Sequence, residues 1–168
     1  SDVCSSDLRL SETKFRNLWE YSLDAHSLRF PPDWKLADCN PAMVTLMGAH
    51  SVEHLKSFPL ESQYPLHQPD GELSMEVLQR AFGTALEQGS FRGELRLKPP
   101  GKGLMDCDLS MTRVVLDGRV AVQATLRDIT ASKAAQDEQR RLLAERTTLL
   151  DEVHHRVKNN LRSEEHTS

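Results

Sequence analysis

The sequence predicts an α+β fold that ends in one long α-helix, and three observations carry this prediction. Two short strand candidates and several short helices come first, and three longer segments with alternating apolar residues follow them. The dipeptide Asp117-Gly118 between the last two segments indicates a tight hairpin. Residues 131–161 contain neither Gly nor Pro, which favours an uninterrupted helix. The length of 168 residues suits one domain with an extension.

The two ends are expected to be foreign to the protein. The codons AGA TCG GAA GAG CAC ACG TCT encode residues 162–168, and the reverse complement of that DNA, read one base in, encodes residues 2–8. One DNA word therefore accounts for both termini, and it resembles a common sequencing-library adapter. We set residues 1–8 and 162–168 aside as adapter-like, which leaves residues 9–161 as natural sequence cut at both sides.

Composition excludes several classes of function. The net charge is −4, but the adapter-like ends hold four acidic residues against one Arg, so the natural part is close to neutral and has no electrostatic footprint for nucleic acid. Outside those ends only Cys39 and Cys107 remain, which form no metal-binding spacing and no disulfide framework. We expect a reduced, cytoplasmic setting. No apolar run approaches the roughly 20 residues of a membrane span, although a span upstream would attach the full-length protein to a membrane.

The natural sequence opens with a predicted helix over residues 11–21. Phe15, Leu18 and Trp19 have the i, i+3, i+4 spacing of one helical face. Ser11 precedes them and can cap the helix by accepting from a free backbone N–H group.

Two short strands and a capped helix come next. Residues 25–30 and 35–39 are the strand candidates. Asn40 then offers an N-cap oxygen, and Pro41 suits the first helical position because its missing N–H would be unpaired there. Gly48 is expected to end this helix.

Two further helices, three strands and the exit helix are predicted after Gly48. Ser51 can cap a short helix over residues 51–56, and a Pro-rich stretch separates it from a helix over residues 74–88 that ends at Gly89. The three remaining strand candidates and the exit helix are residues 91–98, 104–116, 119–127 and 131–161.

Four short motifs follow one another along the chain: Ser11-Glu12-x-x-Phe15-Arg16, Asn40-Pro41-Ala42, Gly48, and Asp128-Ile129-Thr130. Together and in this order they resemble the motifs of PAS sensor domains. The resemblance covers residues 9–130 and implies a five-stranded antiparallel sheet with helices on one face.

The exit motif predicts two signal-transmission residues. Thr130 can cap the exit helix, and Asp128 can take a hydrogen bond or an Arg partner that ties this helix to the sheet. Residues 131–148 are then expected to form a helical coiled-coil linker.

The most specific string of the chain is L-L-D-E-V-H-H-R-V-K-N-N-L, at residues 149–161. It resembles the H-box of the second dimerisation and phosphoacceptor type of histidine kinases, related to the HWE group. In that family the His followed by Arg is phosphorylated, which corresponds to His155. The family continues with Gln where Arg162 stands here, as the adapter interpretation expects.

Helical periodicity favours the same histidine independently. At roughly 100° per residue, Leu150, Val157 and Leu161 fall on one stripe with Val153, while His155 falls almost opposite. We therefore expect the stripe to pair with a second copy, giving a homodimer, and the His155 side to face solvent.

The neighbours of His155 suit phosphoryl transfer. Glu152 lies three residues before it and Asn159 four after, so both share its face. Glu152 is predicted to fix the ring tautomer, as the family implies, and Asn159 to orient the ring or the phosphate. The secondary residues predicted around this site are His154, Asp151, Arg156 and Lys158.

The resemblance implies a protein histidine kinase as the full-length enzyme. It would move the γ-phosphoryl group of ATP, with Mg²⁺, to His155 and then to an aspartate of a response-regulator receiver domain. Residues 9–161 contain no Gly-rich nucleotide motif, and Gly101-Lys102-Gly103 reads as a loop. The catalytic domain is missing, and the fragment is expected to be inactive alone.

No cofactor is predicted, and the PAS ligand stays unknown. A flavin photosensor needs Cys inside an N-C-R-F-L-Q-like string, but Cys39 precedes Asn40 here. Haem would need a His on the helix over residues 74–88, which has none. Adjacent histidines point about 100° apart and H-E-x-x-H is absent, so no metal site is predicted.

Two other functions stay open as alternatives. One is a non-catalytic PAS module whose helix only drives dimerisation, and the other is a PAS module that feeds a nucleotide cyclase. The string at residues 149–161 argues against the second.

Overall fold

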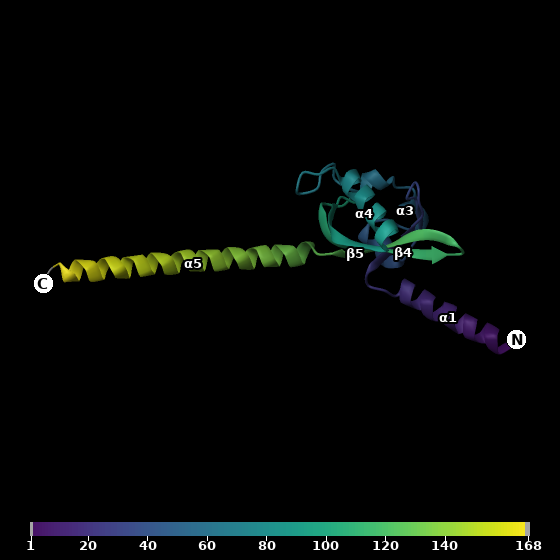
Figure 1. Cartoon of the computed structure of the whole chain (residues 1–168), viewed down its shortest axis with the longest axis horizontal. Helices are drawn as coiled ribbons and strands as arrows, with labels where there is room; N and C mark the ends of the chain where they lie inside the picture. Colours follow the sequence, from purple (N-terminus) through teal and green to yellow (C-terminus); the bar gives the residue numbers. More distant parts are fainter. Residues whose placement is uncertain (1, 167–168) are drawn as a thin grey trace. The chain divides into compact units, whose positions relative to one another are not determined.

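The structure, a computed structural model, describes residues 2–166 and divides into two compact units that meet between Ile129 and Thr130. The first unit contains four α-helices, one short 3-10 helix and a five-stranded sheet, and the second is a single helix (Figure 1). In chain order the elements are α1 (Asp2–Glu20), β1 (Ala25–Arg29), β2 (Leu36–Cys39), α2 (Pro41–Leu46), α3 (Val52–Lys56), η1 (Leu60–Gln63), α4 (Ser74–Gln88), β3 (Ser90–Leu97), β4 (Met105–Leu116), β5 (Arg119–Asp128) and α5 (Thr130–Glu165).

The sheet is antiparallel throughout, in the order β2-β1-β5-β4-β3. Asp117 and Gly118 join β4 to β5, with φ of 50° and 72°, the left-handed backbone that a two-residue hairpin loop with right-handed strand twist requires. This confirms the predicted hairpin. The last strand lies beside the first, with Ala25 opposite Leu126, so β5 occupies the centre of the sheet.

One face of the sheet is covered by helices α2, α3 and α4, and the hydrophobic core lies between these helices and the sheet (Figure 1). Period-two alternation on β4 buries every second residue from Met105 to Met111, as predicted from the sequence. Helix α4 supplies Leu78, Phe82 and Ala85 from one side. The α+β fold with five antiparallel strands is therefore confirmed.

Local capping chemistry sets several element ends as predicted. The Asn40 side chain accepts from the N–H of Met43 at the start of α2. Ser51 does the same for α3. Gly89 follows α4 with φ of 94°, a backbone conformation that residues with a Cβ rarely adopt.

Two helix boundaries differ from the predictions. Helix α1 begins at Asp2, so Ser11 lies inside it and is not its cap. No Gly or Pro interrupts residues 2–20, and the adapter-like residues therefore continue the helical pattern. Helix α5 begins at Thr130, one residue early, which puts Thr130 at the first helical position instead of the preceding cap position. Within residues 2–166, no helix is both long and apolar enough to cross a membrane.

Candidate functional site

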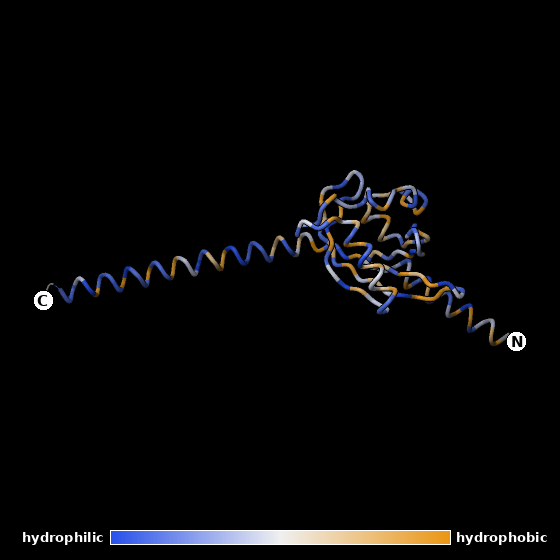
Figure 2. Tube along the Cα trace, turned by 45° about the horizontal axis from the view of Figure 1, so that its top comes forward, coloured by the Kyte–Doolittle hydropathy of each residue, from blue (hydrophilic) through white to orange (hydrophobic). Residues whose placement is uncertain are grey.

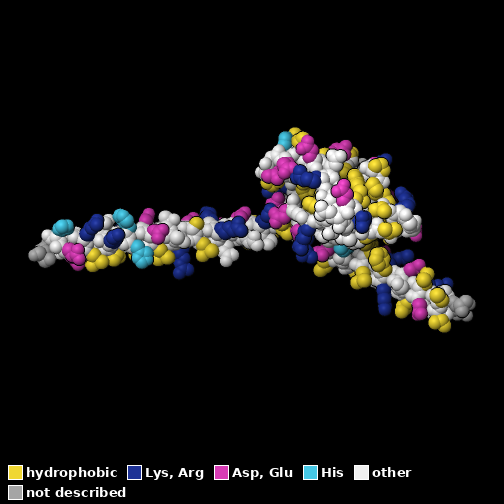
Figure 3. All heavy atoms as spheres, viewed as in Figure 1, with side chains coloured by type: hydrophobic (Ala, Val, Ile, Leu, Met, Phe, Trp, Pro, Cys, Tyr) yellow, Lys and Arg dark blue, Asp and Glu magenta, His cyan; other side chains and the backbone are white. Residues whose placement is uncertain are grey.

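Helix α5 carries the predicted phosphoacceptor site, and none of its described residues is buried. Hydrophilic residues dominate its course and hydrophobic ones interrupt them at intervals (Figure 2). The hydrophobic side chains gather along one side of the helix (Figure 3). Leu150, Val153 and Val157 of this stripe remain 51–55% exposed. In water such a stripe favours pairing with another apolar surface.

The ring of His155 is exposed and has one hydrogen-bonding neighbour among the described residues. Nδ2 of Asn159 lies 3.3 Å from Nδ1 of His155, one helical turn on. Within residues 2–166, no hydrogen bond or ion pair joins Glu152 or Asp151 to this ring. The geometry thus brings Asn159, and not the predicted Glu152, to the imidazole.

The amide of Asn159 can serve either tautomer of His155. Its nitrogen donates when Nδ1 has a lone pair, and after a 180° flip its oxygen accepts when Nδ1 carries the proton. The second arrangement leaves the Nε2 lone pair free to attack an electrophile. The remaining predicted residues of this face are exposed and make no hydrogen bond or ion pair with His155 in the described part of the chain: His154, Arg156 and Lys158.

The predicted transmission residue Asp128 is the last residue of β5. It lies opposite Cys107 in the register of β4. The next N–H group, that of Ile129, donates to the carbonyl of Asp106 at 2.8 Å and so extends the ladder to the end of the first unit. Asp106 also accepts two bonds from Arg96, at 2.7 and 3.0 Å. The exit from the sheet is therefore anchored on β4.

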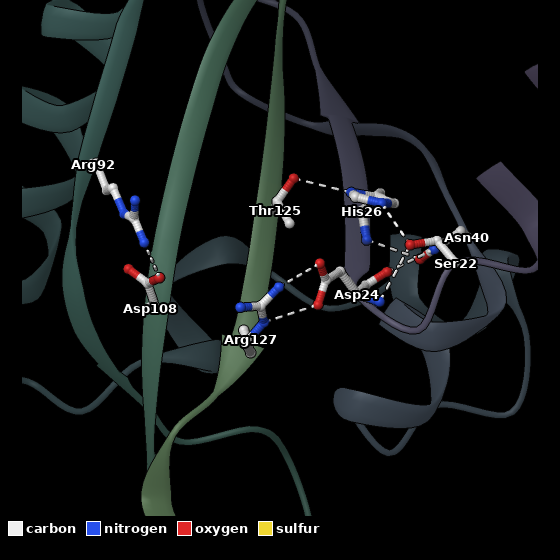
Figure 4. Close-up of polar contacts among 8 residues, drawn as sticks. All are labelled: Ser22, Asp24, His26, Asn40, Arg92, Asp108, Thr125 and Arg127. Atoms are coloured by element: carbon white, nitrogen blue, oxygen red, sulfur yellow. Dashed lines mark hydrogen bonds and ion pairs between the residues drawn. The ribbon is translucent and has the colours of Figure 1, made fainter. Parts of the chain in front are cut away.

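A second polar cluster, which we call the β1–β5 network, comprises Ser22, Asp24, His26, Asn40, Thr125 and Arg127 (Figure 4). Its centre is Asn40, whose side chain is fully buried. The Asn40 oxygen accepts from the N–H groups of His26 and Met43, at 2.8 and 3.1 Å. Its nitrogen donates to the carbonyls of Trp19 and Asp24, at 3.1 and 2.9 Å. One side chain thus connects the end of α1, β1 and the start of α2.

His26 connects β1 to β5 through both ring nitrogens. Nε2 lies 2.9 Å from the Ser22 hydroxyl, and Nδ1 lies 2.9 Å from the Thr125 hydroxyl (Figure 4). The ring also stacks on Trp19, with centroids 5.5 Å apart. Burial lowers the pKa of His26 below its ordinary value, although Asp24 opposes the shift. A neutral ring can donate to one hydroxyl and accept from the other.

An ion pair completes the network. The Arg127 guanidinium donates to both carboxylate oxygens of Asp24, at 3.0 and 2.8 Å, and these hydrogen bonds lower the pKa of Asp24 (Figure 4). Arg92 and Asp108 form a similar pair between β3 and β4, at 3.0 Å. Sequence reasoning assigned no role to His26, Asp24 or Arg127, because partners about a hundred residues apart leave no local signal.

Neither Cys39 nor Cys107 has the properties of a reactive thiol. Burial raises the pKa of Cys39 to about 11 and that of Cys107 to about 12. Both side chains belong to the hydrophobic core. Among residues 2–166, no three His, Cys, Asp or Glu side chains are grouped to hold a metal ion.

Because the reactive species is the thiolate, we expect a thiol reagent such as DTNB at pH 8 to modify only Cys4, which is exposed, in the folded protein. All three cysteines should react after unfolding in guanidinium chloride. The Cys4→Ser variant provides the control and should show no fast phase when folded. Rapid labelling of folded Cys4→Ser protein would contradict the buried positions of Cys39 and Cys107.

Comparison with solved structures identifies the fold. No protein-family model and no curated protein matches the sequence. Among solved structures, a PAS domain of a Colwellia psychrerythraea protein superposes with a TM-score of 0.58 at 18% identity, over 71% of this chain and 97% of that one. A PAS domain of a Haloarcula marismortui HTR-like protein gives 0.58 at 17%, over 77% and 100%. A PAS domain from a two-component sensor histidine kinase gives 0.54 at 13%, over 73% and 98%.

These similarities define an α+β fold with an antiparallel sheet, which in this chain has the strand order β2-β1-β5-β4-β3. The fold is that of a PAS domain, as the sequence motifs predicted. At such identities only the fold follows. The relation of residues 149–161 to the HWE-type H-box and the adapter-like origin of the termini stay predictions.

Proposed function

We propose that this chain is the sensory and phosphoacceptor part of a two-component histidine kinase. The PAS unit would receive the signal, and His155 would accept the γ-phosphoryl group of ATP from a catalytic domain outside this chain and pass it to an aspartate of a response-regulator receiver domain. The observation that carries the proposal is the solvent-facing imidazole of His155 beside the Asn159 amide, within an H-box-like string. PAS-fold neighbours from sensor histidine kinases support the sensory role.

The proposed transfer needs little from this chain beyond one nucleophile in the right tautomer. The Nε2 lone pair of His155 attacks the γ-phosphorus, the P–N bond forms, and the P–O bond to ADP breaks. Neutralisation of the phosphate charge would be supplied by Mg²⁺ and the catalytic domain. The positive charge that develops on the ring is stabilised by an acceptor at Nδ1. Asn159 holds that nitrogen before reaction, and Glu152, one turn earlier, is the carboxylate that takes the Nδ1 proton after a side-chain rotation.

The surrounding charges suit a reaction between macromolecules. Arg156 and Lys158 flank His155 with exposed positive side chains that can accompany the phosphoryl group. Asp151, four residues before His155, shares its helix face, and His154 lies at the flank of that face. The apolar stripe on the other side of α5 would pair with a second copy, so that a homodimer presents two such surfaces. A cytoplasmic location is part of this proposal.

The test is phosphorylation in trans. The chain is mixed with the ATP-binding domain of a histidine kinase of the same type, Mg²⁺ and γ-labelled ATP, and the acid-labile, alkali-stable label of a phosphohistidine is measured. We expect His155→Ala to abolish labelling, Glu152→Gln to slow it about 100-fold as a general-base change, and the matched His154→Ala to keep most of it. Full labelling of His155→Ala would show that the phosphoacceptor is assigned wrongly.

The exposed stripe of α5 also favours a second candidate, a PAS module whose helix only dimerises. In that case no variant would be labelled, while sedimentation would still show a dimer that the stripe substitution Val153→Asp dissociates. A PAS module feeding a nucleotide cyclase stays an alternative that the DNA sequence beyond Leu161 would distinguish.

A further inference from the structure

The segment between β1 and β2 folds back onto the core, and we call residues 30–35 the β1–β2 loop. Trp34 in this loop is half-buried, and its indole stacks on the ring of Phe82 with centroids 4.1 Å and planes 11° apart. Phe82 belongs to α4 and is buried, whereas the neighbouring loop residues Asp33 and Lys35 are exposed. A side chain of an exposed loop therefore covers a core residue of α4.

The backbone of Trp34 is strained. Its φ of 54° lies in the left-handed region, where a Cβ crowds the following carbonyl oxygen and bulky residues are rarely found. Among the described residues, the other non-glycine residue with such a φ is Asp117, whose two-residue hairpin loop requires it. Trp34 does not lie in a loop of that kind. Strain of this sort persists only where surrounding contacts impose it, and it is typical of segments that switch between two states.

Contacts on several sides impose this conformation on Trp34. The buried guanidinium of Arg29, at the end of β1, donates from Nη1 to the Trp34 carbonyl at 2.7 Å. The N–H group of Trp34 donates to the carbonyl of Phe30 at 3.1 Å. Together with the stack on Phe82, these bonds hold the peptide groups on both sides of Trp34 as well as its side chain. Loss of the Arg29 donor would therefore leave a strained backbone with fewer contacts to hold it.

The same loop is connected to β5, the central strand of the sheet. Arg29 lies opposite Val122 in the register of β1 and β5. The Arg119 guanidinium, at the start of β5, lies over the ring of Phe30 at 4.3 Å from its centroid, a cation–π contact. A change in the loop therefore alters the contacts of the strand from which α5 follows.

We propose that the β1–β2 loop is a lid with a closed and an open state, and that Arg29 and Phe82 hold it closed. In the open state the Trp34 carbonyl leaves the guanidinium of Arg29, the indole leaves the ring of Phe82, and the backbone relaxes out of the left-handed region. Relief of strain favours opening and the lost contacts oppose it, so a small change in these contacts shifts the balance between the two states. Opening uncovers Phe82 and changes the contacts of β5, which makes the lid a device that links the surface of the PAS unit to its central strand.

The lid concerns the PAS unit alone, so its test needs neither a ligand nor phosphorylation. Trypsin is added to the full chain under native conditions, and mass spectrometry measures the initial rate of cleavage after Lys35, whose side chain is 85% exposed. A protease cleaves a locally opened segment, so this rate follows the population of the open state. Cleavage after Arg113, within β4, requires the sheet to open and is the internal reference.

The first variant, Arg29→Met, removes the donor that holds the Trp34 carbonyl. We expect cleavage after Lys35 to become about tenfold faster relative to cleavage after Arg113, since a charge-assisted hydrogen bond of the closed state is lost. The matched control Arg92→Met removes an exposed guanidinium of β3 and should be cleaved after Lys35 like the wild type.

A second pair of variants isolates the strain of Trp34. Trp34→Ala and Trp34→Gly both lose the stack on Phe82, but only the Ala variant keeps a Cβ, which is strained at positive φ. We expect cleavage after Lys35 to be about fivefold faster in Trp34→Ala than in Trp34→Gly. This comparison decides the question if Arg29→Met unfolds, since both of its variants keep Arg29.

Unchanged cleavage after Lys35 in folded Arg29→Met would overturn the proposal, and so would equal cleavage of Trp34→Ala and Trp34→Gly. If the lid variants behave as expected and His155 is not labelled in trans, only the proposed kinase function fails. If labelling occurs and the cleavage rates do not differ, only the lid fails.

Discussion

Asn40→Ala is expected to lower the free energy of unfolding by about 3 kcal/mol or more. The substitution removes the cap of α2 and leaves the N–H group of His26 and the carbonyls of Trp19 and Asp24 without the partner they have in the buried network. Each buried group left unsatisfied costs about 1–3 kcal/mol. Urea unfolding, followed by circular dichroism, measures the loss.

The matched control for this change is Ser51→Ala. Ser51 also caps a short helix, but within the part of the chain that the structure describes its side chain makes only the one cap hydrogen bond, which it accepts from the N–H of His54. It should therefore cost about 1 kcal/mol. If Asn40→Ala and Ser51→Ala unfold at the same urea concentration, Asn40 acts only as a cap and the connections it makes to α1 and β1 contribute no stability.

Phe82→Ala should be destabilising by about 3–5 kcal/mol, the usual cost of deleting a buried phenyl ring. Phe82 is 2% exposed, belongs to the core-facing side of α4, and stacks on Trp34. Its removal takes away buried apolar area and leaves the indole without its partner. Tryptophan fluorescence should change in the folded state, and the urea midpoint should fall.

Phe15→Ala is the same substitution on a surface. Phe15 is 67% exposed on α1, so its removal should change the free energy of unfolding by no more than about 0.5 kcal/mol. A similar loss for both variants would mean that α1 packs against an apolar surface in solution, most simply that of a second copy.

Features that depend on neighbours in sequence could be predicted. The hairpin at Asp117-Gly118 follows from the backbone conformation its loop requires, and the start of α2 follows from the chemistry of Asn40 and Pro41. The alternation of β4 follows from burial on one face. The position of His155 opposite the α5 stripe is a consequence of helical period alone, which is equally local.

Features that depend on pairing between distant segments could not be predicted. His26 meets Thr125, and Asp24 meets Arg127, only because the first strand pairs with the last. The burial of the Arg29 side chain likewise could not be predicted, because it depends on the packing of distant segments around β1. The choice between Glu152 and Asn159 at His155 is a matter of side-chain rotamers on one helix face, which sequence spacing leaves undecided.

The pairing of β1 with β5 has a consequence for how such a unit is built into a larger protein. The start of β1 at Ala25 and the end of β5 near Leu126 are paired in the sheet. The polypeptide therefore enters and leaves the sheet at neighbouring positions. A unit of this kind can be grafted between two pre-existing segments without driving them apart. One domain of this kind can therefore replace another during evolution without changing the distance between the segments that precede and follow it.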